Sequence, residues 1–268
     1  MQKVFKTLEE TITYKIFKLL VLYFAELIEV VGDLGINLYQ AVKFLFTGEI
    51  NLKNTIDQCS RFGFDSLYIT LSMVGVSGMI IALEIAYEMS KQGAGNFVGS
   101  LVTLSMIKEI GPIMASFAII SMVGSSMAAE IGTMKVTEQV DALKILRVNP
   151  IGYLIVPRII AGFVMMPFIV IISTCVGILG GMIASNLTAG ISCLNYLQSV
   201  WSGLYEKDII VCLIKSCILG GMISLICSSI GYKTEGGAME VGTATTKAVV
   251  WSFVTIVIID YIISLMFF

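Results

Sequence analysis

Four ionisable residues lie inside long apolar segments, where charged side chains are rare. Lys108 and Glu109 are adjacent in one apolar stretch, Lys215 lies in another and Asp260 in a third. A charge at the centre of a membrane helix costs at least about 2.5–3.5 kcal/mol, so each of these residues suggests a function. Such groups pair with one another or line a polar path through the membrane.

A Gly-Pro step follows the first charged pair directly. Pro112 has no backbone N–H, and its ring disfavours a regular helix around it. We therefore predict a helix break at Gly111 and Pro112, of the kind that membranes tolerate where it lines a cavity. Glu84, near the end of the first apolar stretch, and Asp208, at the start of the fourth, are further candidates for the same path.

These charges can be arranged in two ways. In the first, Glu109, Lys215 and Asp260 line or brace a central lipid cavity, with Lys108 and Asp208 near its outer mouth. In the second, Lys215 forms a buried ion pair with Asp260 or Glu109 that holds helices together, and loss of one partner would destabilise the fold strongly. The residue types alone do not choose between them.

Several kinds of chemistry are excluded by composition. The chain has no histidine, which removes Ser-His-Asp sites, Cys-His sites and histidine-ligated metals. Its six cysteines form no C-x-x-C pair, so we predict neither a metal site nor a disulfide framework. No Gly-Lys dipeptide exists for an ATP-binding P-loop. A net charge of −2 gives no reason to expect nucleic acid.

The elements that must position the charges are membrane helices. The chain is 57% hydrophobic and 13% charged, with a mean hydropathy of +0.92. A span needs about 20 apolar residues, and five stretches qualify: 66–90, 97–127, 151–185, 209–230 and 247–268. We therefore predict an all-α integral membrane protein with an N-terminal segment, 1–65, and a transmembrane domain, 66–268.

A sixth apolar stretch, 15–46, has a different pattern. Its charged residues fall on one narrow stripe of a helix, which favours a helix lying in the membrane interface. A spanning helix with its stripe inside a bundle is the alternative. Small residues also recur at four-residue spacing, as in Gly177 and Gly181 or Gly220 and Ser224, and such pairs let helices approach closely.

The segment 128–150, between the second and third spans, is unusually polar. Val136, Val140, Leu143 and Leu146 recur at helical spacing, which predicts a short amphipathic helix over 136–147. Thr137 is the expected N-cap. Such a helix could dock a partner, lie on the bilayer or simply connect two spans.

The basic residues indicate the orientation. With the N-terminus inside, the inner segments hold thirteen lysine and arginine residues and the outer ones hold two, Lys91 and Lys207. The positive-inside rule therefore predicts that 128–150 is cytosolic and that the C-terminus is outside.

A long, ordered set of residues closely resembles the MlaE (YrbE) family of ABC transporter permeases. The matching residues are Glu109-Ile110-Gly111-Pro112, Gly124-Ser125, 129–143, Asn149-Pro150, Pro157-Arg158, Gly236-Gly237-Ala238, Gly242 and Ala244-Thr245-Thr246. The resemblance covers about residues 66 to 268.

The resemblance implies a function and a set of partners. It implies a homodimeric permease for phospholipid or another lipid in a Gram-negative inner membrane, with relatives in plastid envelopes. A cytosolic ABC ATPase would supply ATP and Mg, so this chain needs no cofactor of its own, and an outer MCE-domain protein would shuttle lipid. The loop helix would be the coupling helix, contacting the ATPase through Glu130, Lys135, Thr137, Glu138, Gln139, Asp141, Ala142 and Leu143.

The sequence departs from the family pattern at three places, with Met122 in place of an arginine, Glu84-Ile85 in place of Gln-Gly and Arg147 in place of a glycine. Two other functions stay open. An ion-gradient-driven transporter would use Glu109, Lys215 and Asp260, whereas a membrane scaffold would not need them charged. An enzyme is the weakest hypothesis.

Overall fold

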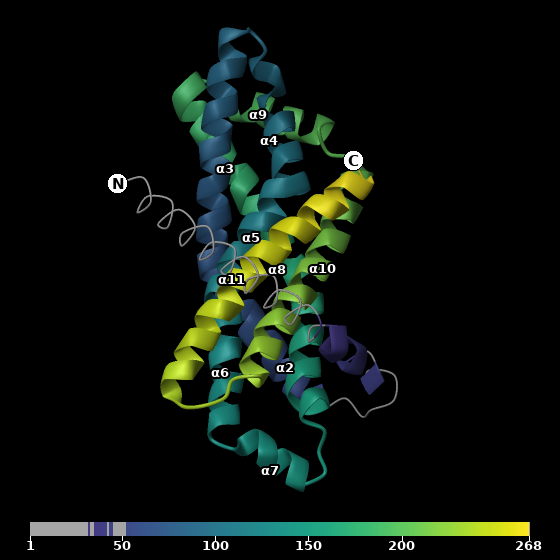
Figure 1. The fold of residues 1–268 in the computed structure, drawn as a ribbon. Helices are drawn as coiled ribbons and strands as arrows, with labels where there is room; N and C mark the ends of the chain where they lie inside the picture. The colour runs from purple at the N-terminus through teal and green to yellow at the C-terminus, as the bar shows by residue number, and fades with distance from the viewer. Residues whose placement is uncertain (1–31, 33–34, 42, 45–51, 268) are drawn as a thin grey trace, which may run out of the picture.

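The chain forms an elongated bundle of long helices (Figure 1). The computed structural model describes residues 32, 35–41, 43–44 and 52–267. No strand occurs among these residues, and five helical runs are long and apolar enough to cross a membrane. The runs are Leu52–Lys91, Gly95–Val136, Ile151–Ala189, Glu206–Tyr232 and Ala238–Phe267. The predicted all-α class and the five spans are confirmed, whereas most of the predicted interfacial helix, 15–46, lies outside the described residues.

The first span begins earlier than the apolar pattern predicted. It consists of α2 (Leu52–Ser60), the π-helical η1 (Arg61–Asp65) and α3 (Ser66–Lys91). Polar residues in α2 excluded it from the predicted apolar stretch, which started at residue 66. The helix nevertheless continues through both segments, because the wider π turn accommodates the change without breaking it.

The second span begins with a turn of 3-10 helix and then alternates between α and π geometry. Its segments are η2 (Gly95–Phe97), α4 (Val98–Ser105), η3 (Met106–Ile110), α5 (Gly111–Ile119), η4 (Ile120–Gly124) and α6 (Ser125–Val136). The predicted break at Gly111 and Pro112 is wrong, since the chain stays helical there. The π turn of η3 precedes Pro112, which then occupies the start of α5, where a missing N–H is tolerated.

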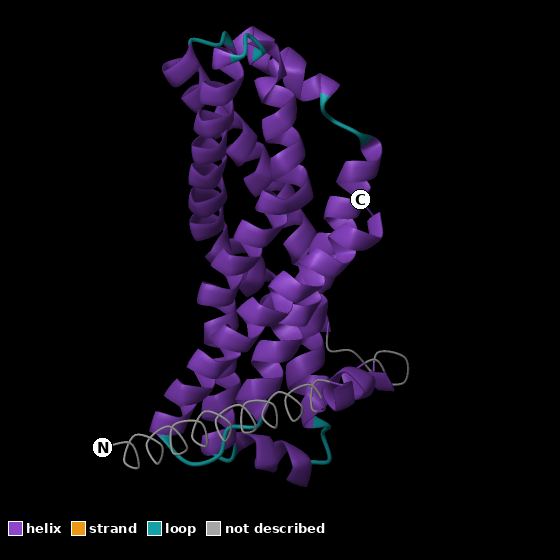
Figure 2. Cartoon of the chain, turned by 45° about the horizontal axis from the view of Figure 1, so that its top comes forward, coloured by secondary structure: helices purple, strands orange, loops and turns teal. Residues whose placement is uncertain are grey.

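The remaining helices complete the bundle and cap its two ends. The short α7 (Gln139–Ile145) follows the second span, and the third span comprises η5 (Ile151–Ile155) and α8 (Val156–Ala189). Then come α9 (Cys193–Ser202), α10 (Glu206–Tyr232) and α11 (Ala238–Phe267). Figure 1 shows α7 and α9 at opposite ends of the bundle, and Figure 2 shows that the loops gather at these ends.

Glycines let α8 pack closely against two neighbours. A Cβ atom on Gly78 of α3 would collide with the carbonyl of Gly177, and one on Gly162 would collide with the carbonyl of Gly220 in α10. These contacts confirm the predicted close approach of small residues. They occur within one chain, so they fix the positions of α3, α8 and α10, and hence of the charged side chains that these helices carry.

Candidate functional site

Lys215 lies at the centre of a buried ion cluster, which we define as Lys215, Glu109, Asp260 and Ser264. The Lys215 side chain is fully buried, and its Nζ donates to Glu109 Oε2 at 3.0 Å and to Ser264 Oγ at 2.8 Å. Asp260 Oδ1 lies 2.8 Å from the same nitrogen, and the Ser264 hydroxyl donates to Glu109 Oε1 at 2.7 Å. The structure thus brings together the three charges that the sequence singled out, on η3, α10 and α11.

The missing N–H of Pro112 explains one more contact of Lys215. In a regular α-helix the carbonyl of Lys108 would accept from the N–H of residue 112, but proline has none. Lys215 Nζ donates to this carbonyl at 2.9 Å. The ammonium therefore satisfies a backbone group that Pro112 leaves without its helical donor, and this fixes η3 against α10.

The two remaining predicted outer charges form a separate pair. Lys108 Nζ lies 3.4 Å from Asp208 Oδ1, with the lysine side chain 33% exposed and the aspartate nearly buried. Glu109 is 41% exposed as well, so adjacent residues present a cation and an anion at the surface of this chain. Glu84 is exposed on α3 and is not a member of the ion cluster.

A second group of charges lies toward the α7 end of the bundle. Glu130 of α6 accepts from Arg158 Nη2 at 2.8 Å and from Arg61 Nη1 at 3.2 Å. Arg158 is buried and also donates to the Leu154 carbonyl at 2.7 Å. We call Glu130, Arg158 and Arg61 the arginine cluster. The resemblance implied an ATPase contact for Glu130, whereas its hydrogen bonds here join α6 to α8 and η1.

The loop helix is shorter than predicted and starts differently. α7 spans Gln139–Ile145 rather than 136–147. Thr137 is not its N-cap, because its hydroxyl donates back to the Thr133 carbonyl at 2.8 Å and it closes the end of α6. Glu138 precedes α7 in the left-handed conformation, with φ of 61° and no side-chain cap. α6 therefore continues further than the pattern indicated, and a sharp turn separates it from α7.

Asp141 anchors the charges around α7. Its carboxylate lies 2.8 Å from Lys144 Nζ and 3.5 Å from Lys135 Nζ. The hydrogen bond from Lys144, together with the nearby positive charge of Lys135, lowers the pKa of Asp141, and the same hydrogen bond raises the pKa of Lys144. Lys135 at the end of α6 is thus tied to the first turn of α7.

The outer face of α7 is unusually apolar for a surface helix. Val140 is buried and Leu143 partly buried, whereas Gln139 and Ala142 are exposed. Beyond them, Ile145 is 83% exposed and Leu146 is 72% exposed. Large apolar side chains that face outward at the tip of a loop suit contact with a partner chain or with the bilayer surface.

The residue that ends this segment explains one departure from the family pattern. Arg147 has φ of 59°, in the left-handed region that glycine occupies without steric cost. A glycine, which the resemblance implied at this position, would adopt this conformation without strain. Arginine adopts the same turn here, and the turn directs the chain toward Asn149 and the third span.

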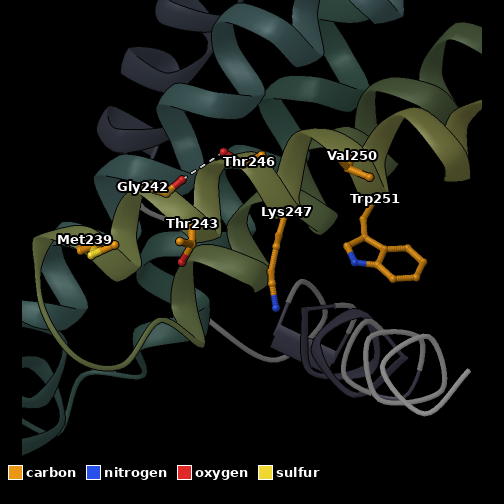
Figure 3. A pocket seen from close by; sticks show the side chains of 7 residues that line it. All are labelled: Met239, Gly242, Thr243, Thr246, Lys247, Val250 and Trp251. Atoms are coloured by element: carbon orange, nitrogen blue, oxygen red, sulfur yellow. Dashed lines mark hydrogen bonds between the residues drawn. The ribbon is translucent and has the colours of Figure 1, made fainter. Parts of the chain in front are cut away.

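A pocket lies beside the first half of α11, and the sequence did not single it out as a site. It has a volume of about 530 Å³ and is lined by Met239, Gly242, Thr243, Thr246, Lys247, Val250 and Trp251. All seven residues come from one helix, as Figure 3 shows, and Thr246 donates to the Gly242 carbonyl at 3.2 Å. The resemblance included Gly242 and Thr246, and that match was the signal for this surface.

Arg158 and Arg61 were also missing from the predicted site. Arg158 stands in the motif Pro157-Arg158 at the start of an apolar span, which was a usable signal for a buried cation. No group of three or more cysteine, aspartate or glutamate side chains within the described ranges is arranged to hold a metal ion.

Comparison with known proteins agrees with this architecture. Residues 55–266 match the family model described as "Permease MlaE". The chain is 39% identical over 229 residues to a probable ABC transporter permease of Synechocystis, covering 85% of this chain and 87% of that one. It is 37% identical over 238 residues to a probable ABC transporter permease of Rickettsia prowazekii, covering 89% and 92%.

A plant relative is similarly close. The chain is 37% identical over 229 residues to the Arabidopsis thaliana protein TRIGALACTOSYLDIACYLGLYCEROL 1, chloroplastic. The match covers 85% of this chain and 65% of that protein.

Proposed function

Because this chain belongs to the MlaE family of permeases, we propose that it is the membrane subunit of an ABC transporter that moves phospholipid or another lipid. Bacterial relatives are named as probable ABC transporter permeases, and the plant relative bears the name of a glycolipid. The chain itself is a non-catalytic, multi-pass membrane component.

The ATPase site belongs to another chain in this proposal. A permease that lacks a P-loop requires a partner ATPase with bound ATP and Mg, and force must reach the membrane through a contact surface. α7 is the best candidate for that surface, and its exposed Ile145 and Leu146 are the observation that carries the proposal. They would enter an apolar groove of the ATPase, with Glu138 and Gln139 at its rim.

The tie between α7 and the spans would transmit the movement. Lys135 ends α6, and its ion pair with Asp141 joins α6 to the first turn of α7. A displacement of α7 would therefore act on α6 and, through Glu130, on α8 and η1. In this scheme Glu130 and Lys135 transmit movement from the ATPase rather than contact it.

Assembly and orientation follow from the exposed spans and the basic residues. α3 and α11 are the least buried spans, which suits a homodimer that encloses a lipid path between two copies. With α7 in the cytosol, the C-terminus and α9 face the periplasm, where an MCE-domain protein would exchange lipid. The membrane would be a bacterial inner membrane, and maintenance of outer-membrane lipid asymmetry is one role that such a system would serve.

The partly exposed charges would meet the lipid. Lys108 and Glu109 are both partly exposed, and both lie on η3 just before α5 begins. A cation beside an anion suits a polar headgroup in an otherwise apolar path. Lys215, Asp260 and Asp208 would brace these two residues.

Purification of the tagged protein from its own membrane tests the proposal. We expect an ATPase chain to co-purify and to hydrolyse ATP, and both to be lost with Ile145→Asp plus Leu146→Asp. Leu194→Asp is the matched control, because Leu194 is 74% exposed on α9 at the opposite end of the bundle. A permease that purifies alone and moves lipid on an ion gradient would contradict the proposal.

A further inference from the structure

The ion cluster contains more acceptors than its central cation can serve. A lysine ammonium has three hydrogens. Lys215 Nζ already donates to the Lys108 carbonyl, to Glu109 Oε2 and to Ser264 Oγ, all within 3.0 Å. Asp260 Oδ1 lies 2.8 Å from the same nitrogen and is a fourth oxygen around three hydrogens. The cluster is therefore short of one hydrogen.

The charges of the cluster do not balance either. One ammonium faces two carboxyl groups, so two ionised carboxyls would leave a surplus negative charge inside the bundle. The cluster lies nine residues from the start of α10, roughly 14 Å along the helix. Asp260 is 3% exposed, and an unpaired charge at such a place is strongly unfavourable.

A single proton resolves both deficits. When two carboxyls share a site, one of them holds its proton, because the second negative charge has no compensating partner. A protonated Asp260 removes the surplus charge, and as a neutral group it needs a hydrogen bond from Lys215 far less than a carboxylate would. Glu109 is the better carboxylate, because both of its oxygens already accept, one from Lys215 and the other from Ser264.

We propose that Lys215, Glu109 and Asp260 form an intramembrane proton-binding site, in which the two carboxyl groups hold one proton and Asp260 carries it in this conformation. The groups that face Asp260 from other elements are Lys215 of α10 and Glu109 of η3. Lys108, also on η3, is directed to Asp208. The proposal rests on the geometry of this cluster alone and stands apart from the proposed lipid transport.

The site can exchange its proton without changing the charge of the cluster. Glu109 is the more exposed carboxyl, whereas Asp260 is enclosed. Transfer of the proton from Asp260 to Glu109 gives an Asp260 carboxylate paired with Lys215 and a neutral Glu109. The neutral Glu109 side chain is then free to turn away from Lys215. The deep carboxyl thus replaces the exposed one as the lysine's partner, and the proton leaves with Glu109.

Infrared spectroscopy of the protein in lipid nanodiscs at neutral pH tests the site. We expect a carbonyl band of a protonated carboxyl that shifts in D2O, disappears in Asp260→Asn and persists in Glu84→Gln, the exposed control. In Glu109→Gln the band should also disappear, because Asp260 must then ionise to pair with Lys215. A spectrum without a component removed by Asp260→Asn overturns the proposal.

The thermal midpoint gives a second, independent measurement. Asparagine has the shape of a protonated aspartate and no charge, so Asp260→Asn should unfold within a few degrees of the wild type at neutral pH. The double variant Asp260→Asn, Glu109→Gln leaves Lys215 without an anion and should unfold at a much lower temperature. If Asp260→Asn alone is as destabilised as the double variant, Asp260 is an obligatory anion and the site does not hold the proton.

Discussion

The ion cluster and the arginine cluster are built alike but differ in which charge is in surplus. In each, one buried cation contacts a carboxylate on a neighbouring helix, Lys215 with Glu109 and Arg158 with Glu130. The third member is an acid in the first case and a base in the second. Asp260 is enclosed with 4% of its side chain exposed, whereas 61% of Arg61 is exposed.

The two clusters differ in whether the surplus charge reaches water or headgroups, and this decides whether that charge needs another partner. Arg61 lies near the α7 end of the bundle and keeps its guanidinium in contact with water or headgroups, so its charge needs no further partner. Asp260 has no such access and must be neutralised where it is. The comparison suggests that the arginine cluster is a structural tie, whereas the ion cluster is a site whose state can change.

The largest expected effect comes from removing the enclosed cation. Lys215→Met leaves the enclosed Asp260 and the partly exposed Glu109 without their ammonium, and it also removes the donor to the Lys108 carbonyl. We expect the free energy of unfolding to fall by about 4 kcal/mol, as for other broken buried pairs. Unfolding of the purified protein in mild detergent measures the change.

Lys108→Met is the control for that variant. It removes the cation next to Glu109 in the chain, but this lysine is 33% exposed and lies 3.4 Å from Asp208, farther than Lys215 lies from its two acids. We expect a clearly smaller loss. Equal losses for the two variants would mean that burial does not distinguish the ion cluster from its neighbour.

The corresponding change in the arginine cluster should cost less. Arg158→Met removes a buried cation, but Glu130 is 30% exposed and keeps its bond to Arg61. We expect a loss of about 2 kcal/mol, mainly from the broken hydrogen bonds to Glu130 and to the Leu154 carbonyl. A loss as large as that of Lys215→Met would show that Arg61 does not compensate Glu130.

The sequence predicted the ion cluster better than the arginine cluster for a physical reason. Glu109, Lys215 and Asp260 each stand in the middle of an apolar run, where any charge is conspicuous, and a lysine among acids has few possible partners. Arg158 and Arg61 stand near span ends, where basic residues are expected in any membrane protein. Nothing in the order of residues distinguishes a buried arginine there from a snorkelling one.

The helix boundaries show a second limit of sequence patterns. Five spans followed from apolar length, but the π turns did not, because they depend on contacts with other helices. Pro112 predicted a break, but the chain stays helical there, and Lys215, 103 positions away, donates to the Lys108 carbonyl that Pro112 leaves without its helical donor. Thr137 likewise looked like an N-cap, but its hydroxyl closes α6 instead.

A conservative substitution separates charge from geometry in the arginine cluster. Arg158→Lys keeps the positive charge, but a single ammonium on a shorter side chain replaces the two guanidinium nitrogens that bond Glu130 and the Leu154 carbonyl. We expect a loss of about 1 kcal/mol, roughly half that of Arg158→Met. If lysine restores the full stability, the charge alone matters, and the planar fork of arginine has no role in joining α6 to α8.

The smallest effect should come from the exposed member of the arginine cluster. Arg61→Gln removes a surface ion pair with Glu130, and such pairs contribute no more than about 1 kcal/mol because water screens both partners. We expect a change of about 0.5 kcal/mol or less in the wild type. In the Arg158→Met background the same change should cost more, since Glu130 then has no other cation. A double-mutant cycle measures this coupling, and additive losses would show that the two arginines act on Glu130 independently.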